Sequence, residues 1–112
     1  MKFFSKLFFK PQYEYVRYTA KDEETASQGQ YTFLVMSQKD GTWRAYVLEH
    51  PELNGRSGIG TKVHLYRDGN SNQVYVCVVQ DIFSKEQMIA VAKLWARKFQ
   101  RYIATGKSFE EK

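Results

Sequence analysis

The sequence has very little cysteine, histidine or proline. Of its 112 residues, one is cysteine, two are histidine and two are proline. Because Cys77 has no second cysteine to pair with, an intramolecular disulfide and a cysteine-rich zinc cluster are both excluded, and a reducing cytoplasm is the expected location. No His or Cys pair has the close spacing of zinc ligands, so we expect no metal and no cofactor.

The sequence also has no long apolar run. The longest, at residues 74–79, is far shorter than the roughly 20 residues that a membrane-spanning helix requires. The stretch MKFFSKLFFK at residues 1–10 begins like a signal peptide, but Lys6 splits its apolar part and no small-residue cleavage site follows. We therefore expect neither a transmembrane segment nor an export signal, and this aromatic and basic segment is expected to dock onto the domain or onto a partner.

The residues that are present are those of a globular protein rich in aromatic side chains. Hydrophobic residues make up 43% and charged residues 26%, with eight phenylalanines, eight tyrosines and two tryptophans. A chain of this length folds as one domain, which we assign to residues 1–112, with an N-terminal segment at 1–11, a β-meander at 12–80 and a helix at 84–106. The net charge of +5 favours encounter with anionic partners.

The C-terminal helix has the clearest local signals. Ser84 and Gln87 form a capping box, and Gly106 provides a stop, so the pattern predicts a helix over residues 85–105. Apolar residues recur along it with helical spacing on one arc. They are Met88, Ile89, Ala92, Trp95, Ala96, Phe99, Tyr102 and Ile103.

Two predicted hairpins precede the helix. Residues 31–38 and 42–49 flank Asp40-Gly41, which suits a tight turn, and residues 61–67 and 73–80 flank a polar turn at 68–72. Residues 13–19 add another candidate strand. The predicted fold class is therefore α+β, with an antiparallel meander sheet of four to five strands packed against one long C-terminal amphipathic helix. The unbroken apolar run at 74–79 predicts a central strand covered on both faces.

Catalytic signatures are weak in this sequence. His64 is the strongest candidate for an acid or base, but a histidine within a strand is more often structural. Cys77 lies among valines, which predicts an inert core thiol. The glycines at residues 55–60 do not match a dinucleotide-binding motif; Arg56 could hold an anion there, but an ordinary connection is favoured. Gly106 belongs to a helix cap and not to a phosphate-binding loop.

A basic and aromatic patch is the most interesting prediction. Side chains alternate along a strand, so Lys62, His64 and Tyr66 are expected on one face of their strand. Arg44 and Tyr46 are expected to share a face of another strand. If these faces coincide, the patch offers rings for stacking with bases and cations for phosphates, although tyrosines also occur in sheets for packing alone.

A basic stripe on the helix offers the same two alternatives, a nucleic-acid-binding surface or an ordinary structural one. It consists of Lys93, Arg97 and Arg101, opposite the apolar arc. The stripe is either an edge that follows a phosphate backbone or a solubilising surface, and the second is favoured.

Three hypotheses for function follow from the sequence. The leading one is a small non-enzymatic binding or protein-interaction module that binds a protein partner or itself, because tyrosine, tryptophan and arginine concentrate energy at protein contacts. The alternative is a nucleic-acid-binding protein that uses the sheet patch and the helix stripe. The third is an unrecognised enzyme.

Overall fold

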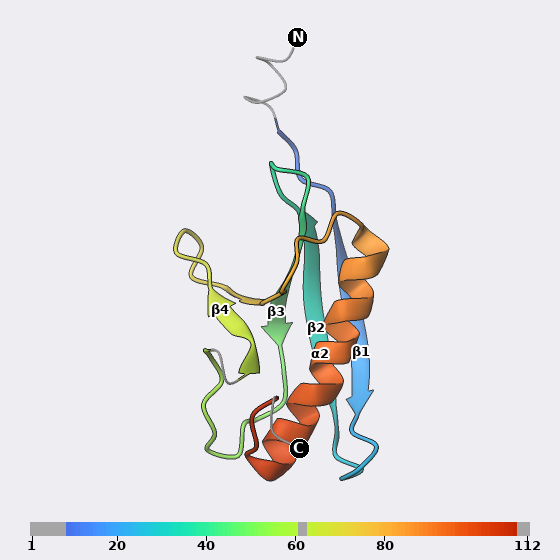
Figure 1. The fold of residues 1–112 in the computed structure, drawn as a ribbon, viewed down its shortest axis with the longest axis vertical. Coiled ribbons are helices and arrows are strands. Elements are labelled where there is room, and N and C mark those ends of the chain that lie inside the picture. The colour runs from blue at the N-terminus through green and yellow to red at the C-terminus, as the bar shows by residue number, and fades with distance from the viewer. Residues whose placement is uncertain (1–8, 61–62, 110–112) are drawn as a thin grey trace.

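The computed structural model describes residues 9–60 and 63–109, which form a sheet and one long helix (Figure 1). The strands are β1 (Tyr13–Lys21), β2 (Gln28–Ser37), β3 (Trp43–Glu49), β4 (Leu65–Arg67) and β5 (Val74–Val76), followed by the helix α2 (Lys85–Thr105). Every strand pair is antiparallel. The predicted α+β class, a five-stranded antiparallel sheet against a C-terminal helix, is confirmed.

The order of the strands differs from their order in the chain at one place. The sheet runs β1-β2-β3-β5-β4, so β5 lies beside β3 and β4 forms an edge. After β3 a long connection leads to β4 at the edge of the sheet, and β5, the return strand of the second hairpin, then takes the position next to β3. Both predicted hairpins form, and only their mutual placement departs from a sequential meander.

The two ends of α2 are held as the sequence predicts. The Ser84 hydroxyl accepts a hydrogen bond from the Gln87 backbone N–H, and Gly106 adopts a φ of 77° while its N–H donates to the Tyr102 carbonyl. The last turn of α2 contains no basic residue. Arg56 supplies the missing cation, because its Nε donates to the Ile103 carbonyl at 3.0 Å. Arg56, in the segment for which the sequence favours an ordinary connection over an anion site, therefore stabilises a helix end.

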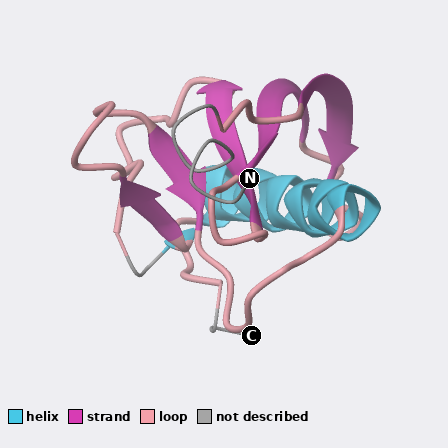
Figure 2. Ribbon diagram, turned by 90° about the horizontal axis from the view of Figure 1, so that it is seen from above, coloured by secondary structure: helices cyan, strands magenta, loops and turns pink. Residues whose placement is uncertain are grey.

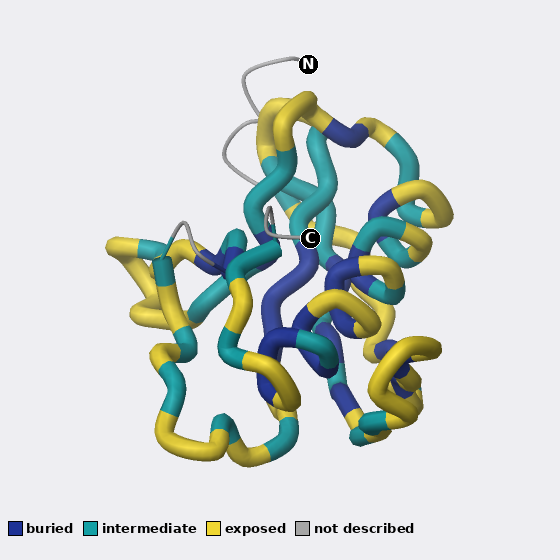
Figure 3. The backbone as a smooth tube through the Cα atoms, turned by 60° about the horizontal axis from the view of Figure 1, so that its bottom comes forward, coloured by how far each residue is buried: buried dark blue, intermediate teal, exposed yellow. Residues whose placement is uncertain are grey.

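The helix covers one face of the sheet, where it packs on β1, β2 and β3 (Figure 2). Trp95 and Phe99 are only 3% and 0% exposed, and their rings stack at 4.6 Å between centroids. They meet Tyr31 and Phe33 of β2 edge to face. Buried segments lie where the helix meets the sheet, and exposed ones lie at the turns (Figure 3). The apolar arc of α2 is thus the helical half of the core.

The last two strands are shorter than the sequence predicts. β4 and β5 have three residues each. β4 begins only at Leu65, after the left-handed backbone of His64, and β5 ends at Val76, where the chain leaves the sheet and runs toward Ser84 at the start of α2. Val74–Val76 of the apolar run do form a strand inside the sheet, between β3 and β4, but the run as a whole is not a strand covered on both faces. Its residue Val79 is fully exposed, and Cys77 is half-buried instead of lying in the core.

Candidate functional site

The face of the sheet that α2 leaves uncovered carries a row of large side chains. Strand registers place Tyr15 opposite Leu34, Leu34 opposite Tyr46, Tyr46 opposite Tyr75, and Tyr75 opposite Tyr66. Alternation puts all of them on the face opposite the buried Val16, Phe33, Ala45, Val76 and Leu65. We call the five residues of the open face, Tyr15, Leu34, Tyr46, Tyr75 and Tyr66, the aromatic row. It crosses every strand of the sheet.

Exposure along the aromatic row is uneven. Tyr15 is 61% exposed at one end and Tyr66 39% at the other, whereas Tyr46 in the middle is buried. Tyr13 extends the surface beyond Tyr15, with which it makes an edge-to-face contact. The row thus has a fixed centre and two accessible ends.

Arg44 organises the centre of this face. Its guanidinium lies over the Tyr75 ring at 4.1 Å and donates to the Asp68 carboxylate at 3.2 Å. The Tyr46 hydroxyl donates to the same carboxylate at 3.2 Å. Hydrogen bonds from the Asn70 N–H and the Tyr46 hydroxyl, together with the positive charge of Arg44, lower the pKa of Asp68 below its usual range. The structure therefore brings the predicted pair Arg44 and Tyr46 together, with the arginine charge balanced locally.

The remaining predicted members of the sheet patch do not all join it. Tyr66 does, with its ring edge to face against Tyr75 at 6.4 Å. His64 does not, because its φ of 53° interrupts the strand alternation and its ring packs on Phe109 at 5.3 Å, on the side of α2. The expectation that His64 and Tyr66 share a face is thus corrected by the backbone conformation. Lys62 lies outside the described residues.

The basic stripe of α2 lies beside β1, on the side of the sheet that the helix covers. Lys93 approaches the Tyr18 ring at 5.4 Å, and Arg97 donates to the Tyr18 hydroxyl at 2.8 Å. Arg101 forms an ion pair with Glu24 at 3.0 Å. The stripe and the aromatic row therefore lie on different sides of the molecule, and no single flat surface contains both.

Several residues of this site were missing from the sequence-based set. Tyr13 and Tyr15 repeat with a spacing of two in the first strand, a signal that the polar residues among them obscured. Tyr75 is hidden inside the apolar run of residues 74–79. Asp68 reads as a turn residue, and only the folded chain brings its carboxylate to Arg44.

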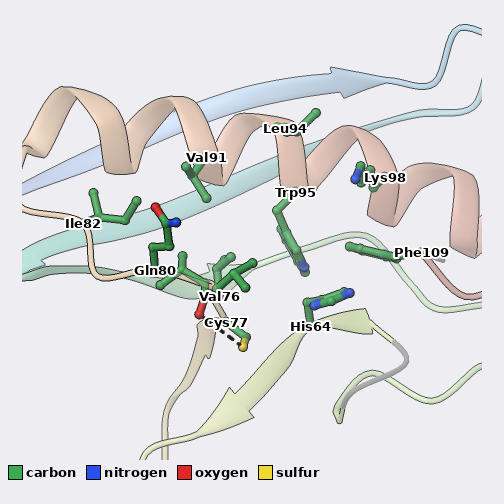
Figure 4. A pocket seen from close by; sticks show the side chains of 12 residues that line it. His64, Val76, Cys77, Gln80, Ile82, Val91, Leu94, Trp95, Lys98 and Phe109 are labelled. Carbon is green, nitrogen blue, oxygen red and sulfur yellow. Dashed lines mark hydrogen bonds between the residues drawn. The ribbon is translucent and has the colours of Figure 1, made fainter.

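A groove on the helix side is the second feature of interest. It has a volume of about 520 Å³ and runs between α2 and the segment that follows β5 (Figure 4). Val76, Ile82 and Trp95 form its buried floor, and Leu94 and Val79 lie exposed on its rim. Its other lining residues are His64, Cys77, Val78, Gln80, Val91, Lys98 and Phe109. The groove is mainly apolar.

A third, polar hollow of about 530 Å³ lies where β1 and β2 extend beyond β3. Arg17, Thr32, Glu49 and His50 are among its lining residues. The Thr32 hydroxyl donates to Glu49 at 2.6 Å, so this carboxylate already has a partner. Of the three features, the aromatic row is the one that joins all the strands.

The fold and its surfaces define a small α+β domain with one covered and one open sheet face. Within residues 9–60 and 63–109, no group of three or more His, Cys, Asp or Glu side chains could hold a metal ion. The helix described here is not apolar enough along its length to cross a membrane. No family model, curated protein or solved structure matches this chain.

Proposed function

We propose that this chain is a small non-enzymatic protein-interaction module that associates with a second copy of itself through the aromatic row. The observation that supports this is the row itself, which spans all five strands on the face that α2 leaves open. Tyrosine and arginine are enriched at the energetic centres of protein contacts. Tyrosine rings bury large areas while their hydroxyls remain able to form hydrogen bonds.

The chemistry of this face suits contact with a copy of itself. In a two-fold dimer the same patch lies on both subunits, so it has to be self-complementary. Tyrosine hydroxyls both donate and accept, and Asp68 balances the charge of Arg44. Two such faces can therefore meet without like-charge repulsion at their centre. Sheets packed face to face, roughly 10 Å apart, are a common arrangement.

Light scattering after size-exclusion chromatography, over a series of protein concentrations, tests this proposal. The mass of the wild-type chain is expected to rise toward that of a dimer. Tyr15→Asp places a charge in the contact and should keep the chain monomeric. Phe83→Asp is the matched control, since Phe83 is similarly exposed, at 65%, but lies outside the row. A strict monomer at the highest concentration would reject self-association.

Nucleic-acid binding is the second candidate, because exposed rings at Tyr13, Tyr15 and Tyr66 share the open face and could stack with bases. It ranks second, since Arg44 is paired and the basic stripe of α2 lies elsewhere. Labelled single-stranded and duplex oligonucleotides titrated over a salt series provide the test. Tyr66→Ala would then weaken single-strand binding by roughly 1–3 kcal/mol, and an affinity without salt dependence would remove the electrostatic premise.

The cytoplasm is the location that we propose for this module. Cys77 is a free thiol, so nothing in the fold depends on an oxidising compartment.

A further inference from the structure

We infer that the apolar groove beside α2 binds a single molecule of a medium-chain carboxylate, with the aliphatic tail toward Ile82 and the carboxylate at Lys98. This site is separate from the aromatic row, which lies on the opposite face of the sheet, and the inference does not depend on self-association. The groove volume of about 520 Å³ is within the usual size range of small-molecule sites.

The shape and lining of the groove indicate an elongated aliphatic ligand. Figure 4 shows the lining side chains following α2 from Ile82 at one end to Phe109 at the other. The floor is buried, with Val76 and Trp95 each 3% exposed, whereas Leu94 on the rim is 46% exposed. An extended hydrocarbon chain lying over this floor would remove the exposed apolar surface of the rim, at Leu94 and Val79, from water.

The charges at the groove place the carboxylate. Lys98 lies at the end formed by Trp95 and Phe109, and the side chain at the opposite end is the neutral Gln80 (Figure 4). Within the part of the chain that the structure describes, no carboxylate forms an ion pair with Lys98, unlike Lys85 and Arg101. The Trp95 indole N–H already donates to the Val63 carbonyl at 2.8 Å. Among the described residues that line the groove, Lys98 is the one lysine and none is an arginine, so the lysine is the group that would receive the anion.

Titration of the full chain with decanoate, followed by amide and indole NMR signals, tests the inference. Saturable shifts are expected at Val78, Leu94 and the Trp95 indole. Decyltrimethylammonium, which has the same tail and the opposite charge, is expected to bind at least tenfold more weakly. Acetate, which lacks the tail, should give no saturable shifts.

Variants separate the role of the groove from that of the rest of the surface. Lys98→Glu should weaken decanoate binding at least tenfold, and Lys93→Glu, on the β1 side of the same helix, should leave it unchanged. Tyr15→Asp should also leave it unchanged, whatever its effect on self-association. The inference is overturned if Lys98→Glu binds normally or if the shifts map to the aromatic row. It is equally overturned if groove signals shift with protein concentration alone, because a second copy would then occupy the site.

Discussion

The two faces of the sheet contain the same kinds of side chain in opposite environments. On the covered face, Tyr31 and Phe33 are sealed against Trp95 of α2. On the open face, Tyr15 and Tyr66 remain accessible to water. The aromatic content of the strands therefore does not distinguish core from surface. Whether a strand residue is buried depends on which face of the sheet its side chain points to, as set by alternation along the strand, and on which face the helix covers.

The largest expected contrast comes from truncating one ring on each face. Phe99→Ala should lower the free energy of unfolding by about 3–5 kcal/mol, because Phe99 is fully buried and its removal leaves a cavity beside Trp95. Tyr15→Ala should change it by only about 0.5 kcal/mol, because that ring is mostly exposed. Urea unfolding of dilute protein, where association is minimal, measures both values. Equal losses would show that the open face is packed as tightly as the core.

A finer contrast comes from removing one hydroxyl on each face. The Tyr31 hydroxyl donates to Gln100 Oε1 at 2.6 Å inside the core, and Gln100 is only 2% exposed. Tyr31→Phe leaves that oxygen buried without its partner and should cost about 1–3 kcal/mol. Tyr46→Phe should cost about 1 kcal/mol or less, since Asp68 keeps its bonds from Arg44 and Asn70.

Adding Gln100→Leu to Tyr31→Phe provides the control for that comparison. The double variant removes both polar partners, so it should recover part of the lost stability. If the double variant loses as much as the sum of the single changes, the hydrogen bond is not the reason for the loss.

The same tyrosine makes a prediction about pH. Burial raises the pKa of Tyr31 well above its usual range, so the folded chain keeps the phenol proton at pH values where the unfolded chain loses it. The stabilisation is complete below the unfolded tyrosine pKa of about 10 and declines as pH rises toward the folded value. Unfolding free energy of the wild type should therefore fall more steeply above about pH 10 than that of Tyr31→Phe, by about 1.4 kcal/mol per pH unit. Parallel pH profiles would contradict this.

The elements that the sequence predicts well are those with local causes. The limits of α2 follow from Ser84 and Gly106, whose capping contacts involve only their near neighbours. The hairpin around Gly41 is local in the same way, because a positive φ of 89° there suits glycine. A capped helix and tight turns therefore need little information from the rest of the chain.

The candidate site was harder to predict because its causes are distant in the sequence. The aromatic row requires the register of five strands together with the position of β5 between β3 and β4. The departure of His64 from the patch depends on a left-handed backbone at a non-glycine residue, which strand alternation does not anticipate. Arg44 and Tyr46 were predicted to share a face, and they do, because they are two residues apart in one regular strand.

A small effect is also expected at Arg44, and it tests whether the open face is internally organised. Arg44→Gln removes the cation over the Tyr75 ring and the ion pair with Asp68, yet it leaves the amide able to donate a hydrogen bond. A partly exposed cation–π contact contributes about 0.5–1 kcal/mol, so the loss in unfolding free energy should fall in that range. A double-mutant cycle with Tyr75→Leu measures the coupling directly. A coupling near zero would mean that strand register alone holds the aromatic row, whereas a positive coupling would show that Arg44 fixes its centre while the tyrosines at its ends remain free to contact a partner.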